Sequence, residues 1–241
     1  MKRIAFILLA LLALVSCGKE EPQQYKVQRI SSVEETFADG SVRVSNYTYK
    51  DDGYVITRKV DDALESVSRL SWRGNLEVHE DSTVVEGVLQ PSRTLTIYYR
   101  DSNLSMIDSV VVKNPAGETT MLDEYTYDGT WYTVVTTEAG VKTTMKVYST
   151  FYSTQTVQNY TYDAETENWK YVSKEETITT YDNDITIVTA YLDNVPTDKT
   201  IYQWLNGNLD FKCYEYSASS WNLVSFGTYY YETLNVQMPA E

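Results

Sequence analysis

Aromatic side chains are the residue type with binding chemistry that this chain holds in excess, with 22 tyrosines and 5 tryptophans in 241 residues. An exposed aromatic ring can stack against the apolar face of a sugar, while nearby carboxylates and amides bind the hydroxyls. The residues that could form such a platform are Trp131, Tyr132, Trp169, Trp204 and Trp221. The same rings could instead fill cross-strand pairs on a broad sheet. Because tryptophans stand at repeated sequence positions, this structural role competes with ligand binding.

The chain offers few residues for nucleophilic or metal chemistry. Its only histidine, His79, lies among acidic residues, and Cys213 lies in a strand-like alternation. Spacing alone leaves a Cys213–His79 pair open, although a small buried residue is the plainer interpretation of Cys213. Acidic pairs such as Asp51-Asp52 do not follow the spacing of a calcium loop, and motifs for nucleotide, zinc-protease or serine-hydrolase sites are absent. We therefore expect no metal site, no cofactor and no catalytic residues.

Carboxylates are the one group with catalytic chemistry that the chain holds in number, with 34 acidic residues. A glycoside hydrolase needs two of them facing each other across a cleft, roughly 5–10 Å apart. No local sequence signature marks such a pair. The sequence therefore favours a protein that is not an enzyme, with a carboxylate-based glycoside hydrolase as an alternative.

The elements that must position these side chains are β-strands. Apolar and polar residues alternate with a period of two along almost the whole chain, which predicts half-buried strands. In the segment 141–151, for example, Val141, Met145 and Val147 share one face and Lys142 lies on the other. Thr, Val and Tyr dominate these segments and suit a pleated sheet. The sequence therefore predicts an all-β fold.

A repeat underlies the predicted strands. Residues 49–72 align without gaps with residues 181–204, and a third copy covers residues 124–148. Past the tryptophans, the G-N-L at 74–76 meets the G-N-L at 207–209 if one residue is inserted. The Y-x-Y steps place two rings on one strand face, and Asp-Gly or Asn-Gly steps supply turns with positive φ.

The uneven spacing of the copies argues against a solenoid or a propeller. We expect a single domain over residues 25–237, an antiparallel meander of repeated β-hairpins that forms a long curved sheet. An open barrel and a β-sandwich are alternatives. The sequence leaves open whether the sheet closes, whether Cys213 is buried, and which oligomeric state the protein adopts.

The N-terminus is typical of a secretion signal. Lys2 and Arg3 precede an apolar run over residues 4–14, which is shorter than a typical membrane-spanning helix. The run ends in Leu14-Val15-Ser16-Cys17, which resembles a bacterial lipobox. The resemblance implies a lipoprotein signal peptide over residues 1–17 and a Cys17 whose sulfur carries diacylglycerol. Two or three acyl chains on one residue anchor a protein durably, so the membrane is an expected partner.

Residues 18–24 form a polar linker between the lipid and the domain. Within it, Gly18-Lys19-Glu20-Glu21 is similar to the export signal of Bacteroidetes lipoproteins that face outward from the outer membrane. This resemblance implies an outer-membrane lipoprotein on the cell surface. A solvated spacer of no further meaning is the alternative, and the two interpretations are compatible.

The Y-x-Y-D and W-x-x-G-N-L steps resemble those of Bacteroidetes secreted lipoproteins of unknown function, whose repeats are distantly similar to YD (Rhs-type) repeats. The likeness covers most of residues 40–235, but the G-R-L element that follows the YD step is absent. The resemblance implies a curved antiparallel sheet on a lipid tether and no established activity. Two triplets, Asp81-Ser82-Thr83 and Asp108-Ser109-Val110, resemble the O-glycosylation sequon of Bacteroidetes envelope proteins, which makes Ser82 and Ser109 candidate glycosylation sites.

The formal charge of −14 restricts the partners further. So acidic a chain lacks the electrostatic footprint of a nucleic-acid-binding protein, and adsorption to anionic lipid is disfavoured. Our leading hypothesis is non-catalytic binding of a carbohydrate or another surface polymer. A structural or adhesin-type envelope component that uses exposed sheet edges is the second hypothesis.

Overall fold

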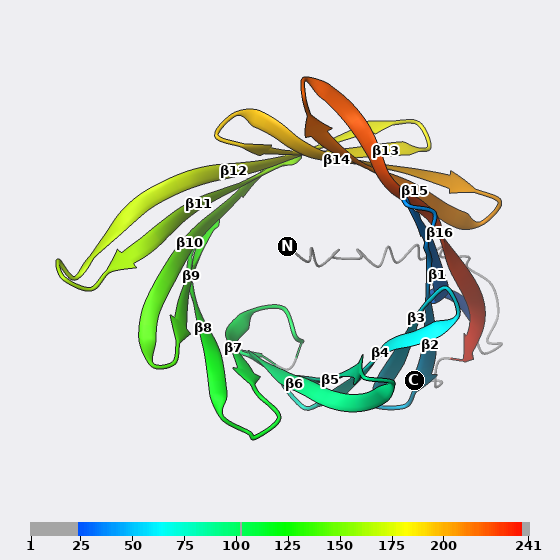
Figure 1. The fold of residues 1–241 in the computed structure, drawn as a ribbon, viewed down its shortest axis with the longest axis horizontal. Coiled ribbons are helices and arrows are strands. Elements are labelled where there is room, and N and C mark those ends of the chain that lie inside the picture. The colour runs from blue at the N-terminus through cyan, green and yellow to red at the C-terminus, as the bar shows by residue number, and fades with distance from the viewer. Residues whose placement is uncertain (1–23, 102, 238–241) are drawn as a thin grey trace, which may run out of the picture.

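The computed structural model describes residues 24–101 and 103–237, which form sixteen β-strands arranged in a ring (Figure 1). The strands are β1 (Gln24–Phe37), β2 (Val42–Lys50), β3 (Gly53–Val60), β4 (Ala63–Arg73), β5 (Leu76–Val85), β6 (Val88–Tyr99), β7 (Ile107–Lys113), β8 (Thr119–Asp128), β9 (Trp131–Glu138), β10 (Val141–Phe151), β11 (Thr154–Asp163), β12 (Asn168–Asp182), β13 (Ile185–Leu192), β14 (Val195–Leu205), β15 (Asn208–Ser217) and β16 (Ser220–Gln237). The expected signal peptide with Cys17, and the linker up to residue 23, lie outside the described residues.

Every strand pairs antiparallel with its neighbour in sequence, and β1 pairs with β16 to close the barrel. The closing register runs from Gln24 opposite Gln237 to Phe37 opposite Ser225. The predicted all-β antiparallel meander is confirmed. Closure of the curved sheet, which the sequence left open, removes both free edges.

The repeat copies have the same strand lengths. The triplets β3–β5, β9–β11 and β13–β15 each contain strands of 8, 11 and 10 residues. The first hairpin of each triplet also carries a register shift two residue pairs before its turn. The sequence alignment inserted one residue so that the two G-N-L steps would match, and the structure shows that this insertion is wrong. Leu76 begins β5 and Asn208 begins β15, so Leu76 corresponds to Asn208 and not to Leu209.

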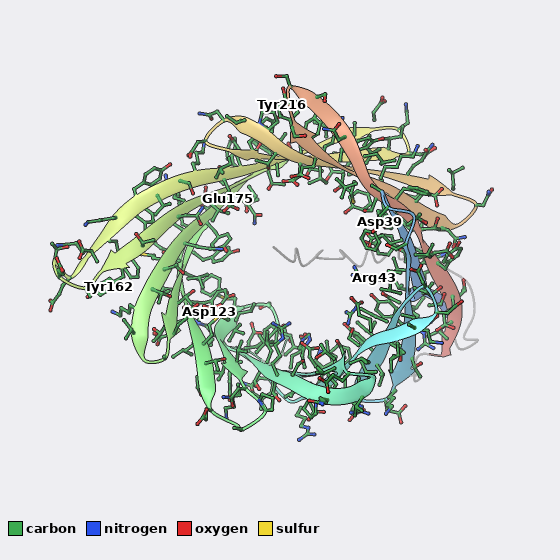
Figure 2. The ribbon with its side chains drawn as sticks, in the orientation of Figure 1. Asp39, Arg43, Asp123, Tyr162, Glu175 and Tyr216 are labelled. Atoms are coloured by element: carbon green, nitrogen blue, oxygen red, sulfur yellow. The ribbon has the colours of Figure 1, made fainter. Side chains whose placement is uncertain are left out.

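The inward face of the barrel is defined by strand register. Figure 2 shows Arg43, Asp123 and Glu175 pointing towards the centre of the ring. Residues opposite one another on neighbouring strands share a face, so the printed pairs extend this face around the ring. The buried apolar side chains of the described residues all lie on it: Ile30, Leu70, Val110, Val112, Val134 and Phe211. None of them is completely buried, so the wall is lined by side chains rather than filled by a packed core, as expected for sixteen strands.

Closure needs a glycine. A Cβ added to Gly227 on β16 would lie 1.9 Å from the carbonyl oxygen of Glu34 on β1. No real contact is so short, so a side chain at this position would force the two closing strands apart.

Gly227→Ala should therefore lower the free energy of unfolding by about 2–3 kcal/mol, because the backbone of a closing strand must move. Chemical denaturation followed by circular dichroism measures the loss. Gly40→Asn is the matched control, since Gly40 has φ of 86° with nothing near its Cβ position and asparagine tolerates this conformation. An alanine at 227 that costs no more than the control would contradict the closed register.

Candidate functional site

Many aromatic side chains of the barrel point inward and form what we call the inner belt. Its members are Tyr47, Tyr49, Tyr54, Trp72, Tyr99, Tyr125, Tyr127, Tyr132, Tyr148, Tyr202, Trp204, Phe211, Tyr229 and Tyr231. The repeat produces the belt, because Y-x-Y pairs and tryptophans stand on the inward face just before hairpin turns. The belt falls into three clusters.

The first cluster lies on β2, β3 and β4. The rings of Tyr49 and Tyr54 are 5.6 Å apart, and Tyr47 lies 5.9 Å from Tyr54. Trp72 meets Tyr54 edge-on at 5.9 Å and remains 39% exposed. Burial raises the pKa of Tyr54 to about 12, so its hydroxyl stays neutral and can both donate and accept hydrogen bonds.

The second cluster lies on β8, β9 and β10. Tyr132 stacks on Tyr148 with ring centroids 4.5 Å apart and planes within 4°, and on Tyr125 at 6.2 Å. Because the rings stack along the wall, their faces contact one another and their edges point inward. Burial raises the pKa of Tyr125 to about 12 and also raises the pKa values of Tyr132 and Tyr148. This part of the wall therefore offers neutral phenol hydroxyls rather than open ring faces.

The third cluster joins β14, β15 and β16. Trp204 lies 5.3 Å from Tyr231, and Phe211 lies 5.2 Å from Tyr229. Trp204 remains 48% exposed. Trp72 and Trp204 are equivalent in the repeat, so the first and third clusters each offer one tryptophan ring that is only partly covered.

Polar groups accompany the rings. The carboxylate of Glu77 lies 2.5 Å from Nε2 of His79 and accepts a hydrogen bond of 2.9 Å from the hydroxyl of Tyr99. The hydrogen bond to His79 is the main cause that lowers the pKa of Glu77. Further round the wall, Thr136 donates to Asp123 at 2.6 Å, while burial raises the pKa of Asp123.

These two carboxylates do not form a hydrolytic pair. Glu77 on β5 and Asp123 on β8 are linked by the directly opposed residues Ile97 and Val110. They are therefore three strand spacings apart, about 14 Å along the wall. This separation exceeds the range of roughly 5–10 Å that glycoside hydrolysis requires.

The structure does not bring the five predicted binding residues together. Tyr132 and Trp204 belong to the inner belt. Trp131, Trp169 and Trp221 lie on the outward face, and the latter two stand near the opposite end of the barrel. Trp169 packs against Tyr162 at 5.0 Å, and Trp221 against Tyr216 at 5.1 Å, as cross-strand pairs do.

Trp72 is the binding candidate that the sequence prediction missed. Its alignment with Trp204 in the repeat was a signal that could have found it. Strand register was the missing information, because it decides which tryptophans share the inward face.

The remaining candidates are scattered. Cys213 is half-buried on the inward face, 3.8 Å from the hydroxyl of Thr200. His79 lies on β5, and β4, β3, β2, β1 and β16 separate it from Cys213 on β15, so no dyad forms along the wall. Ser82 and Ser109 lie on outward-facing positions of β5 and β7, and their glycosylation stays a prediction. Within residues 24–101 and 103–237, no group of three metal-ligating side chains comes together.

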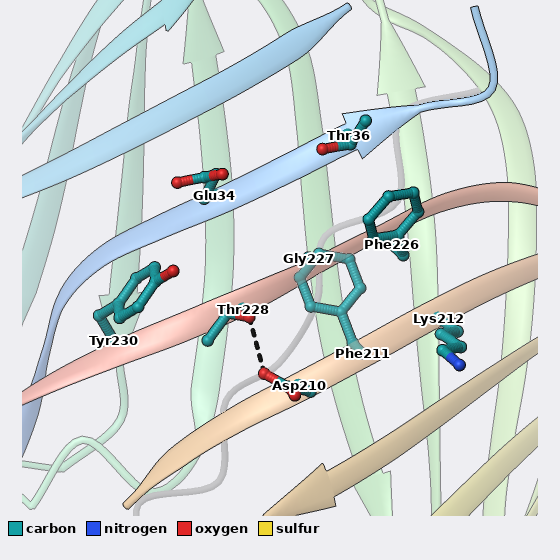
Figure 3. A pocket seen from close by; sticks show the side chains of 9 residues that line it. All are labelled: Glu34, Thr36, Asp210, Phe211, Lys212, Phe226, Gly227, Thr228 and Tyr230. Carbon is teal, nitrogen blue, oxygen red and sulfur yellow. Dashed lines mark hydrogen bonds between the residues drawn. The ribbon is translucent and has the colours of Figure 1, made fainter. Parts of the chain in front are cut away.

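A small hollow lies on the outward face over β1, β15 and β16 (Figure 3). Phe226 and Tyr230 flank the side chain of Thr228, which donates a hydrogen bond of 2.7 Å to Asp210. The volume of the hollow, about 170 Å³, is below the range of small-molecule pockets, so the inner belt is the stronger candidate site.

The outward face mixes charged and apolar side chains in the middle of its strands, and the apolar ones include Val111, Leu122 and Ile187. Charged side chains stand there on strands around the ring: Glu34, Arg69, Glu80, Glu124, Glu176, Lys199 and Lys212. Among the described residues, no helix has the length and apolarity to span a membrane.

Comparisons with known proteins agree with the fold. A porin-like protein from Bacteroides uniformis is similar with a TM-score of 0.51 and 11% identity, over 85% of this chain and 96% of that one. A protein of unknown function from Bacteroides fragilis matches with a TM-score of 0.26 and 12% identity, over 67% and 92%. Transferrin-binding protein B from Haemophilus parasuis matches with a TM-score of 0.22 and 6% identity, over 91% and 77%. No family model and no curated protein sequence matches.

At such low identity the first likeness is one of fold alone, and the lower scores of the other two support no conclusion.

The raised tyrosine pKa values predict a late alkaline transition. Tyr54 and Tyr125 have pKa values of about 12 in the fold against an ordinary value of 10.0. Since the fold favours the neutral phenol, this stabilisation is complete below pH 10 and is lost as the pH rises through about 12. Tyrosinate absorbance, measured with circular dichroism, should show a phase near pH 12 that coincides with unfolding. Tyr54→Phe and Tyr125→Phe should each diminish it, and a single titration near pH 10 of an intact fold would contradict the burial.

Proposed function

We propose that this protein is a non-catalytic, lipid-anchored binding protein of the outer membrane that holds a carbohydrate or another surface polymer against its inner belt. The observation that carries the proposal is the pair Trp72 and Trp204. Both rings face inward at equivalent repeat positions, and both remain partly exposed, at 39% and 48%.

The surroundings of Trp72 suit a sugar. Its ring packs against Tyr54 edge-on, and it stands directly opposite Glu77 on β5. The exposed part of the ring offers an apolar surface for stacking. His79 and Tyr99, which share the same carboxylate, add groups that can donate or accept hydrogen bonds to hydroxyls.

The proposed location rests on the N-terminal sequence. The lipobox-like Leu14–Cys17 supplies the anchor, and Gly18–Glu21 supplies the resemblance to a surface-export signal. We also infer kinship with the Bacteroidetes lipoproteins of unknown function whose YD-like repeats the chain resembles.

Closure weakens the assembly hypothesis. Each described strand has a hydrogen-bonded neighbour on both sides. An adhesin that adds strands to an exposed edge needs an unpaired strand, so the fold favours the binding proposal.

Trp72→Ala and Trp204→Ala should each weaken glycan binding about tenfold, the equivalent of losing one stacking contact of about 1.4 kcal/mol. The full acylated protein, in detergent, is screened against plant, host and microbial glycans by intrinsic tryptophan fluorescence, and the variants are then titrated with the best glycan. Trp169→Ala and Trp221→Ala are matched controls, because both rings face outward, and they should retain binding. Equal loss in all four variants would assign the tryptophans to the fold, and no saturable binding by the folded protein would overturn the proposal.

A further inference from the structure

The two ends of the barrel expose different apolar side chains. Because all the strands are antiparallel and their number is even, residues 24 and 237 stand at the same end as the β2–β3, β4–β5, β8–β9, β10–β11, β12–β13 and β14–β15 turns. We call this end the terminal rim. Exposed aromatic residues gather there: Trp131, Phe151, Tyr152, Tyr181 and Trp204, each between 48% and 89% exposed.

The opposite end exposes aliphatic residues instead. Its turns are flanked by Val85, Val88, Val141, Leu192 and Val195. Among the described residues the segregation is nearly complete, with Leu205 at the terminal rim and Tyr171 and Phe226 towards the other end as exceptions. Aromatic exposure at the terminal rim is therefore a property of one end and not of hairpin turns in general.

The rim aromatics are contiguous. They stand on four consecutive hairpins, at the β8–β9, β10–β11, β12–β13 and β14–β15 turns. Phe151 and Tyr152 meet edge-on, with ring centroids 4.4 Å apart. Tyr152 adopts φ of 51°, a conformation that is costly for a bulky side chain. The turn geometry thus gives no reason for a tyrosine at its tip.

We propose that the terminal rim rests in the headgroup layer of the lipid bilayer to which Cys17 is anchored, with Trp131, Phe151 and Tyr152 in contact with lipid. This inference rests on the lipid anchor of the proposed function. Tryptophan and tyrosine favour the membrane–water interface, where one part of the ring is apolar and another hydrated.

The tether sets the geometry. Residues 18–24 connect Cys17 to β1, and even fully extended they reach at most about 25 Å. The acylated residue therefore holds the terminal rim, and not the aliphatic end, near the lipid surface.

Acidic residues at the terminal rim indicate which kind of lipid headgroup it would contact. Asp128, Asp182 and Asp184 stand beside the rim aromatics, and anionic headgroups would repel them. The rim therefore suits a zwitterionic headgroup layer, with the opening of the barrel at the other end directed away from the membrane.

Depth-dependent fluorescence quenching tests this orientation. The full acylated protein is reconstituted into phosphatidylcholine vesicles whose acyl chains are brominated near the headgroup. Trp131 alone is retained in one variant and Trp221 alone in another, with the other four tryptophans changed to phenylalanine. Trp131 should be quenched at least twofold more strongly than Trp221, which lies near the aliphatic end. Equal or weaker quenching of Trp131 would overturn the inference.

Two further measurements keep the outcome decisive. If a single-tryptophan variant does not fold, Trp131→Phe in the otherwise unchanged chain should reduce the quenching, whereas Trp221→Phe should leave it unchanged. Mass spectrometry of the vesicle-bound protein separates the two proposals. A chain without acyl groups on Cys17 defeats the anchor, whereas an acylated chain with unquenched Trp131 defeats only the contact of the rim with lipid.

Discussion

The pairing of β1 with β16 is the interaction on which the whole structure depends. It joins residues 24–37 to residues 225–237 across nearly the full length of the chain, whereas every other pairing is a local hairpin or a short connection. Local hairpins form readily, but closing so long a loop costs chain entropy and slows folding. Once formed, the pairing removes two edges that would otherwise invite aggregation, and it gives the wall a distinct inside.

The repeat then determines which side chains line the inward face of the barrel. Because the triplets β3–β5, β9–β11 and β13–β15 share strand lengths and the position of their register shift, equivalent residues reach the same face. Leu70, Tyr148 and Tyr202 therefore all point inward, as do Trp72 and Trp204. A register change of one residue would turn these rings outward. The register of the hairpins therefore decides which side chains form the proposed binding surface.

Much of this fold was predictable from local pattern, and much of the site was not. Period-two alternation and the Asp-Gly and Asn-Gly steps predicted the hairpins, because these signals act over a few residues. Closure depends on the pairing of distant strands and on Gly227, which no local pattern reveals. Trp169 and Trp204 look alike in sequence, yet one packs outward on Tyr162 and the other inward near Tyr231. Only the register accumulated around the ring separates them.

The most direct test of this structure is a cross-link between the closing strands. Val33 on β1 lies opposite Tyr229 on β16, and directly opposed residues are within the Cα separation that a disulfide spans. In a Cys213→Ala background, Val33→Cys with Tyr229→Cys should form an intramolecular disulfide under mild oxidation in the folded protein. The mismatched pair Val33→Cys with Thr233→Cys should not. A cross-link that forms only between molecules, or equally well in both pairs, would contradict the closed barrel.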